Sequence, residues 1–115
     1  MAIRTGLGRL MQRGEVRWYR FAEPDKRRPV LILTRQSIFA YLGEATIAPI
    51  TSTIRDIASE VRLTPSDGMP KDCVVNLDHL QTVAKDKLGA LITTLGPGKL
   101  DEVRAALLFA LGFKP

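Results

Sequence analysis

The chain has 115 residues, which is enough for one compact domain and too few for two. With 45% hydrophobic and 25% charged residues, its composition is that of an ordinary globular protein and not of a disordered tail. One cysteine, Cys73, and one histidine, His79, exclude an internal disulfide, and no Cys and His residues have the spacing of a metal site. We therefore expect neither a metal ion nor another cofactor, and we expect Cys73 to be a small buried residue.

The net charge of +5 is concentrated in the N-terminal third of the sequence. Residues 1–35 contain nine basic and three acidic residues, a net charge of +6, whereas the other 80 residues carry a net charge of −1. Such an electropositive region favours a polyanionic partner, with nucleic acid as the first candidate. A solvated basic surface would give the same count, so charge alone leaves both interpretations open.

The sequence shows no sign of a membrane segment or of secretion. Its longest apolar stretch, residues 105–113, is interrupted by Gly112 and is much shorter than the ~20 residues that a membrane helix needs. The N-terminus lacks the apolar run of a secretory signal, so we expect a cytoplasmic protein. Residues 1–12 have no clear periodicity and are expected to be a flexible N-terminal arm or a mis-called start, which leaves residues 13–115 as a single domain.

Short segments with strand patterns predict a β-rich fold. In chain order they are residues 15–20, 29–33, 45–50, 60–63, 73–77, 79–83 and 90–94. The first segment alternates, with Val16 and Trp18 on one face. The second is wholly apolar and suits a buried central strand, in which Pro29 fits only as the first residue. Residues 36–42 are expected to form a short turn or helix.

The C-terminal segment changes to a helical period. Apolar residues recur there at steps of three and four, which predicts a one-sided helix: Leu100, Val103, Leu107 and Leu111. Pro97 suits its first position, Asp101 and Glu102 are expected at its positive end, and Gly112 can terminate it. Several short strands followed by one helix predict a small, strongly curved sheet or partial barrel that is closed by a C-terminal helix.

Four segments and this helix together carry a family likeness. They are Arg-Gly-Glu-Val at 13–16, Arg-Pro-Val-Leu-Ile-Leu at 28–33, Ala-Pro-Ile-Thr-Ser-Thr-Ile at 48–54, Pro-Lys-Asp-Cys-Val-Val-Asn-Leu-Asp at 70–78, and the helix from Leu100 to Gly112. In this order they resemble the MazF/PemK family of mRNA interferases over roughly residues 13–112. Each segment alone is weak, whereas the ordered set is specific.

The resemblance implies an SH3-like barrel that forms a homodimer. It implies the toxin of a type II toxin–antitoxin system, an endoribonuclease that cleaves single-stranded RNA at a short sequence without a metal ion. It also implies a MazE-like antitoxin whose disordered tail lies across the dimer. DNA would then be contacted only indirectly, through the antitoxin complex.

Metal-free cleavage of RNA uses the 2′-hydroxyl of the substrate, which attacks the adjacent phosphorus. The enzyme must give the 2′ proton a route, stabilise the charged phosphorane oxygens, and supply a proton or positive charge at the leaving 5′ oxygen. The products are a 2′,3′-cyclic phosphate and a 5′-hydroxyl. The resemblance places two catalytic residues, Arg28 and Thr51, in this chain.

Arg28 suits electrostatic stabilisation, because a guanidinium stays charged and offers planar donors to two phosphate oxygens. The Thr51 hydroxyl and nearby backbone N–H groups can hold a non-bridging oxygen. The plainer alternatives are a surface arginine beside a strand and a turn-forming threonine, and Ser52 and Thr53 can be turn residues only. The general base is left open.

Six further residues are expected to bind RNA: Trp18, Arg27, Ser52, Arg55, His79 and Gln81. Trp18 can stack on a base, although a tryptophan is as often part of a core or an interface. Arg27 and Arg55 flank the catalytic positions and can bind phosphates. His79 and Gln81 can point into an RNA cleft from one strand face, and His79 is also a spare candidate for the base, since histidine ordinarily titrates near neutral pH.

Three departures from the family pattern accompany this interpretation. The segment from Phe21 to Arg27 is shorter than usual, Arg35 falls near a usual asparagine after the second strand, and Gln81 replaces a usual arginine. These changes point to an altered RNA preference.

Two rival functions are also considered. One rival is a CcdB-like toxin that poisons a protein, although such toxins lack the Arg-Pro-Val and Thr-Ser-Thr segments kept here. The other is a non-catalytic, basic SH3-like module that binds RNA without cutting it.

Overall fold

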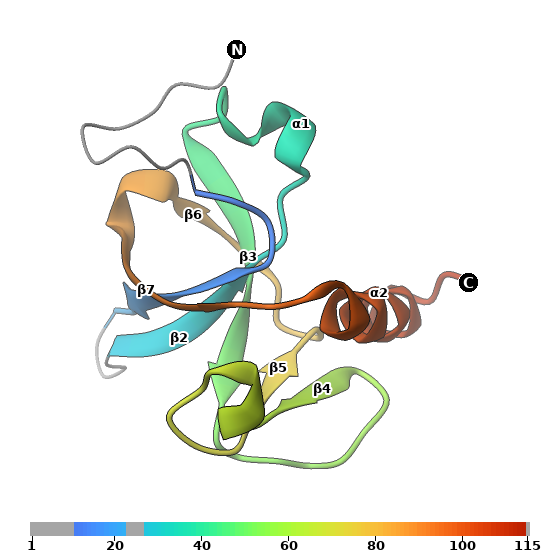
Figure 1. Cartoon of the computed structure of the whole chain (residues 1–115). Helices are drawn as coiled ribbons and strands as arrows, with labels where there is room; N and C mark the ends of the chain where they lie inside the picture. The colour runs from blue at the N-terminus through green and yellow to red at the C-terminus, as the bar shows by residue number, and fades with distance from the viewer. Residues whose placement is uncertain (1–10, 23–26, 115) are drawn as a thin grey trace.

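The computed structural model describes residues 11–22 and 27–114, whose arrangement Figure 1 shows. In this part of the chain the strands are β1 (Glu15–Arg20), β2 (Arg27–Ile32), β3 (Glu44–Thr51), β4 (Glu60–Leu63), β5 (Cys73–Asn76), β6 (Gln81–Ala84) and β7 (Leu88–Thr94). The helices are α1 (Gln36–Phe39) and α2 (Pro97–Leu111), and the 3-10 turns are η1 (Pro65–Asp67) and η2 (Lys85–Lys87). The predicted class, mainly β with one C-terminal helix, is confirmed.

Strand β3 is the centre of an antiparallel sheet with the order β4-β5-β3-β2-β1-β7. One edge of β3 pairs with β2, and the other edge pairs first with β6 and then with β5. Between these two partners, Ala48 and Pro49 have no register partner on that edge, because β5 ends at Asn76 and β6 begins only at Gln81. A proline fits this gap, since it has no N–H to leave unpaired.

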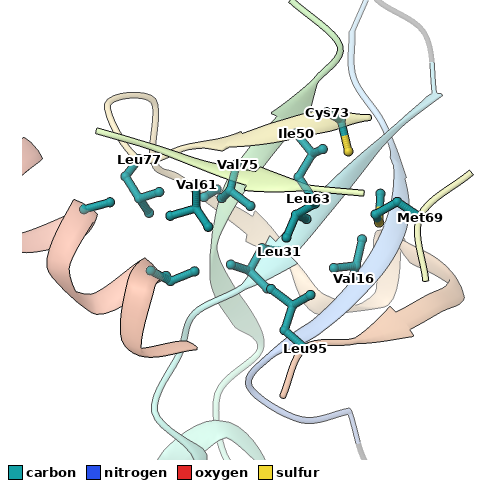
Figure 2. Packing of buried hydrophobic residues seen from close by; sticks show 13 residues of the cluster. Val16, Leu31, Ile50, Val61, Leu63, Met69, Cys73, Val75, Leu77 and Leu95 are labelled. Atoms are coloured by element: carbon teal, nitrogen blue, oxygen red, sulfur yellow. The ribbon is translucent and has the colours of Figure 1, made fainter. Parts of the chain in front are cut away.

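Two hydrophobic clusters lie on opposite faces of the curved sheet. The α2-side core, seen in Figure 2, includes Val16, Leu31, Ile50, Val61, Leu63, Met69, Val75, Leu77, Leu95 and Val103. The β6-side core consists of Val30, Ile32, Phe39, Ala45, Ile47, Val83 and Leu88. Neighbouring residues of β2 alternate between these cores, because successive side chains of a strand point to opposite faces.

The connection from β4 to β5 packs against β7 and so brings the two ends of the sheet together. Its backbone is shaped by a reciprocal cap, in which the Asp67 carboxylate accepts from the Thr64 N–H (2.9 Å) and the Thr64 hydroxyl accepts from the Ser66 N–H (3.1 Å). Gly68 follows with φ +96° and lies directly against Thr93, whose hydroxyl donates to the Asp67 carbonyl (2.9 Å). A Cβ at position 68 would overlap the Thr93 side chain.

Gly68→Ala is therefore expected to lower the free energy of unfolding by about 2–4 kcal/mol, since it combines left-handed backbone strain with overpacking. Gly112→Ala is the matched control, because Gly112 also has positive φ (+79°) but a Cβ there would meet nothing within 4 Å. Urea unfolding of both variants measures the difference. Equal losses of stability would show that the contact with Thr93 contributes nothing.

Helix α2 covers one side of the curved sheet (Figure 1) and has the predicted ends. It begins with Pro97 and ends at Gly112, whose left-handed backbone closes the last turn. Val103 and Ala106 are buried, whereas Leu111 is 53% exposed, so the predicted apolar stripe is only partly covered by this chain. The expectation for Asp101 and Glu102 was wrong: with Pro97 as the first residue they fall in the second turn, and the first turn has no acid.

Some strand boundaries differ from the predicted ones. Pro29 is the third residue of β2 and not the first, because β2 pairs with β3 only from Val30 onward and the earlier residues pair with β1 alone. His79 precedes β6 and lies in the turn after Asn76, which a side-chain hydrogen bond to the Asp78 N–H stabilises. The interpretation of residues 1–10 lies outside the described residues, whereas Met11 already contacts the β6-side core.

Candidate functional site

Two clefts on the sheet surface meet at Arg28 and Thr51, which line both of them. The His79 cleft has a volume of about 350 Å³ and also contains Arg55, His79 and Gln81. The Trp18 cleft has a volume of about 280 Å³ and also contains Trp18, Arg27 and Ser52. The structure thus brings all of the sequence-predicted site residues to one continuous surface.

The register of the sheet explains why Arg28 and Thr51 meet. The β2–β3 ladder ends with Val30 opposite Pro49; Arg28 and Thr51 each lie two residues beyond this last pair, at the same end of the ladder, and both line the two clefts. Both residues project from the same face as Val30, because side chains two apart on a strand share a face. An arginine and a hydroxyl therefore stand side by side where the β6-side core ends.

The same face also carries His79 and Gln81. Gln81 is opposite Ile47 in the β3–β6 ladder, and His79, in the turn just before β6, lines the same cleft as Gln81. Both side chains are exposed. The His79 cleft is lined by residues from both sides of the gap between β5 and β6, since Asn76 ends β5 and Gln81 begins β6.

Thr51 combines a turn-forming role with an available hydroxyl hydrogen. Its Oγ1 accepts a hydrogen bond from the Thr53 N–H (3.1 Å), which shapes the chain as it leaves β3. The turn role considered for Ser52 and Thr53 is thus performed by the Thr51 side chain. Because a hydroxyl that accepts one hydrogen bond can still donate its own hydrogen, Thr51 can donate to an anion in the clefts.

Trp18 and Arg27 form one unit in the Trp18 cleft. The Arg27 guanidinium carbon lies 4.4 Å from the centre of the Trp18 ring, in a cation–π contact. Trp18 is half-buried, and Arg27 is exposed. A base that stacks here meets either the uncovered face of the indole or the outer face of the guanidinium, and both are stacking surfaces for nucleic-acid bases.

Arg55 reaches the His79 cleft from a loop whose shape depends on Glu60. One carboxylate oxygen of Glu60 accepts from the backbone N–H groups of Arg55 and Asp56, each at 3.0 Å. Asp56 has φ +61°, a conformation that non-glycine residues rarely adopt. The sequence analysis did not identify Glu60 as a residue that shapes this loop. The only feature that could have indicated it was an acidic residue at the start of a predicted strand.

Asn76 is a second residue that sequence reasoning missed. It is only 7% exposed at the end of β5 and lines the His79 cleft. Its Oδ1 accepts from the Asp78 N–H (2.9 Å), and its Nδ2 lies 3.0 Å from Nδ1 of His79. The available signal was a polar residue inside an otherwise apolar strand segment. Lys71, which lines the Trp18 cleft, was also missed as a binding residue and adds positive charge there.

Cys73 borders the Trp18 cleft but is only 4% exposed, as expected for a small buried residue. Its thiol has a pKa raised above the ordinary value, chiefly by burial and then by the carboxylates of Asp72 and Asp67, against the opposing effect of Lys71. A raised pKa keeps the thiol protonated at neutral pH, so Cys73 is no nucleophile here.

In the described part of the chain, His, Cys, Asp and Glu side chains nowhere gather in a group of three or more that could hold a metal ion. The same residues include no helix with the length and apolar composition needed to span a membrane.

Comparison with known proteins gives one consistent result. Residues 12–111 match the family model of the PemK-like, MazF-like toxin of type II toxin–antitoxin systems. The probable endoribonuclease MazF2 of Mycobacterium tuberculosis is 37% identical over 103 residues, which cover 89% of this chain and 99% of MazF2.

Solved structures agree in fold. The Mycobacterium tuberculosis toxin MazF-mt6 superposes with a TM-score of 0.80 at 33% identity, covering 88% of this chain and 99% of that one. An endoribonuclease from a mycobacterial species, solved in complex with its cognate antitoxin, gives a TM-score of 0.81 at 26% identity, covering 92% and 99%. These proteins thus share the fold of this chain, a small curved β-sheet with a C-terminal helix. The chain belongs to the PemK-like, MazF-like toxin family.

Proposed function

We propose that this chain is the toxin of a type II toxin–antitoxin system and cleaves single-stranded RNA without a metal ion. The observation that carries the proposal is that Arg28 and Thr51 lie together at the junction of two clefts and line both of them. A guanidinium and a hydroxyl at one point form a donor set for the oxygens of a single phosphate group.

The reaction needs no group beyond the substrate and the chain. The ribose 2′-oxygen forms a bond to phosphorus while its proton passes to a base, and the bond from phosphorus to the 5′ oxygen breaks while that oxygen takes up one proton and leaves as the 5′-hydroxyl. Arg28 and Thr51 donate to the non-bridging oxygens, whose charge grows in the transition state. Arg28 is no base, because an arginine does not lose its proton in proteins, whereas its positive charge favours departure of the 5′ oxygen.

The two clefts suit the nucleotides on either side of the cleaved phosphate. The Trp18–Arg27 pair offers a stacking surface on one side, and Arg55, His79 and Gln81 offer polar contacts on the other. Ser52, in the Trp18 cleft, adds a further hydroxyl donor. Stacking requires bases that are not already stacked in a duplex, which favours single-stranded RNA.

Incubation of the purified chain with single-stranded RNA in excess EDTA tests this proposal. We expect cleavage to persist, and mapping of the fragments is expected to find 5′-hydroxyl and 2′,3′-cyclic phosphate ends. RNA that is bound with a steep salt dependence but never cut would favour the non-catalytic module. Growth arrest with intact cellular RNA and altered DNA topology would favour the CcdB-like alternative.

We further propose that the active form is a homodimer, with the exposed end of α2 at its interface. Phe109, Leu111 and Phe113 are all more than half exposed. Beside them lies a groove of about 490 Å³, lined in part by Leu33, Leu42, Leu80, Leu107 and Leu111. A second copy, with the same protruding apolar side chains and the same groove, is a self-complementary occupant.

Leu111→Asp is expected to shift the chain from dimer to monomer in sedimentation experiments, because it places a charge in the centre of this apolar surface. Ala105→Asp is the matched control, since Ala105 is exposed on the same helix but does not line the groove. A Leu111→Asp variant that stays dimeric would place the interface elsewhere.

The proposed partner in the cell is a MazE-like antitoxin. One structural relative was solved in complex with its cognate antitoxin. We expect an acidic antitoxin segment to compete with RNA for the basic clefts, with DNA contacted only through the antitoxin. Because its substrate is cellular RNA, we place the toxin in the cytoplasm.

A further inference from the structure

A chain of hydrogen bonds under the His79 cleft ends on the imidazole. The Ser59 hydroxyl, on a residue only 2% exposed, donates to Oδ2 of Asp78 (2.6 Å). The Asp78 N–H donates to Oδ1 of Asn76 (2.9 Å), and Nδ2 of Asn76 lies 3.0 Å from Nδ1 of His79. We call this group of four residues the His79 support: Ser59, Asp78, Asn76 and His79.

The His79 support determines which ring nitrogen carries the proton. A backbone N–H can only donate, so the Asn76 atom that faces the Asp78 N–H must be the carbonyl oxygen. The other end of the same amide is then the NH₂ group, which faces Nδ1 of His79 and also can only donate. Nδ1 must therefore accept, and a neutral imidazole with an accepting Nδ1 carries its proton on Nε2.

The protonated nitrogen is directed toward the RNA-binding surface. Nδ1 points to the buried Asn76, whereas the His79 side chain as a whole is exposed and lines the cleft with Arg28 and Thr51. Nε2, the ring nitrogen that Asn76 does not contact, is then the one available to a ligand in the cleft. An N–H in this place donates a hydrogen bond and has no lone pair with which to take a proton.

We propose that Asn76 is a positioning residue that holds His79 as an Nε2–H donor to an acceptor atom on the RNA, so that His79 is not the base for the 2′ proton. This inference rests on the proposed ribonuclease function and makes that function more specific. The acceptor is an oxygen or nitrogen of the substrate, carried either by a phosphate or by a base edge.

The protonation state can be read directly by nuclear magnetic resonance, because His79 is the only histidine in the sequence. In a ¹⁵N-labelled sample, at a pH where the ring is neutral, we expect the long-range ¹H–¹⁵N spectrum to show a protonated Nε2. Asn76→Asp keeps an acceptor for the Asp78 N–H but presents a carboxylate to Nδ1, so it is expected to move the proton to Nδ1. A protonated Nδ1 in the unmodified chain would overturn the proposal.

Cleavage kinetics separate a donor from a base. His79→Gln keeps an N–H at nearly the position of Nε2 and is expected to leave KM within about threefold, whereas His79→Phe, which lacks a donor, is expected to raise KM about tenfold or more. A base would instead lose about 10²–10⁴-fold in kcat in both variants. That loss in kcat would overturn the proposal.

A double-mutant cycle removes the effect of the added charge in Asn76→Asp. If the new carboxylate acts through the orientation of the imidazole, the substitution weakens RNA binding about tenfold in the unmodified chain but has little effect in the His79→Gln background. An equal loss in both backgrounds would mean simple charge repulsion and would contradict a positioning role for Asn76.

Two further readouts locate the acceptor and separate this inference from the proposed function. A phosphate acceptor predicts that His79→Phe weakens all RNA sequences alike, whereas a base acceptor predicts a changed preference at one position. If the unmodified chain binds RNA without cutting it, the ribonuclease proposal fails. The spectrum and the dissociation constants of the same variants then still decide whether His79 is a donor.

Discussion

Arg28→Ala is expected to lower kcat on single-stranded RNA by about 10²–10³-fold while the protein stays folded. Arg28 lines both clefts together with Thr51, and a guanidinium at their junction can donate to two oxygens of one phosphate. Those oxygens gain charge only as the 2′-oxygen attacks, so the loss falls on the transition state and appears in kcat more than in KM. Single-turnover cleavage of a fluorescent RNA measures it.

Two neighbouring substitutions serve as controls for Arg28. Arg28→Lys keeps the charge but loses the planar pair of donors, and is expected to be intermediate. Arg27→Ala removes the contact with Trp18 and is expected to raise KM, because stacking contributes to binding and not to charge stabilisation. If both alanine variants changed only KM, Arg28 would be a binding residue and the catalytic assignment would fail.

Thr51→Val is expected to lower kcat by about tenfold to a hundredfold, because the isosteric side chain removes the hydroxyl donor at the reacting phosphate. The substitution also removes the acceptor for the Thr53 N–H and loosens the chain as it leaves β3. Thr51→Ser retains both functions of the hydroxyl and is expected to keep most of the activity. Parallel rate measurements on the two variants separate the hydroxyl from the methyl group.

Ser52→Ala is the matched control for Thr51→Val, because it removes a neighbouring hydroxyl that lines only one of the two clefts. Ser52 is exposed and lines only the Trp18 cleft, so the loss of its hydroxyl is expected to affect KM and to leave the chemical step nearly intact. A Thr51→Val variant as active as Thr51→Ser would show that the hydroxyl does not contact the reacting phosphate, and Arg28 alone would then stabilise the transition state.

Local patterns were sufficient for most of the fold. Alternation around Val16 and the apolar run at 30–32 indicated strands, and steps of three and four between Leu100 and Leu107 indicated the helix, because both periods follow from backbone geometry alone. Pro97 and Gly112 marked the helix ends through their own backbone restrictions.

Such local patterns could not predict the register of the strands. The start of β6 and the place of Pro29 within β2 depend on which residues of other strands stand opposite, and those partners are distant in sequence. The contact of Gly68 with Thr93, which joins the ends of the sheet, is of the same kind. A glycine between Asp67 and Met69 indicates a turn, but not what the turn packs against.

The sequence by itself determined the class of fold, the basic character of the chain and, through ordered motifs, the pair Arg28 and Thr51. Only the tertiary structure decided what surrounds that pair: the contact of Arg27 with the Trp18 ring, the turn made by Thr51, and the contact of Asn76 with His79. The reason is physical. Residue type sets which hydrogen bonds and contacts a side chain can make, whereas the folded neighbourhood decides which of them it does make.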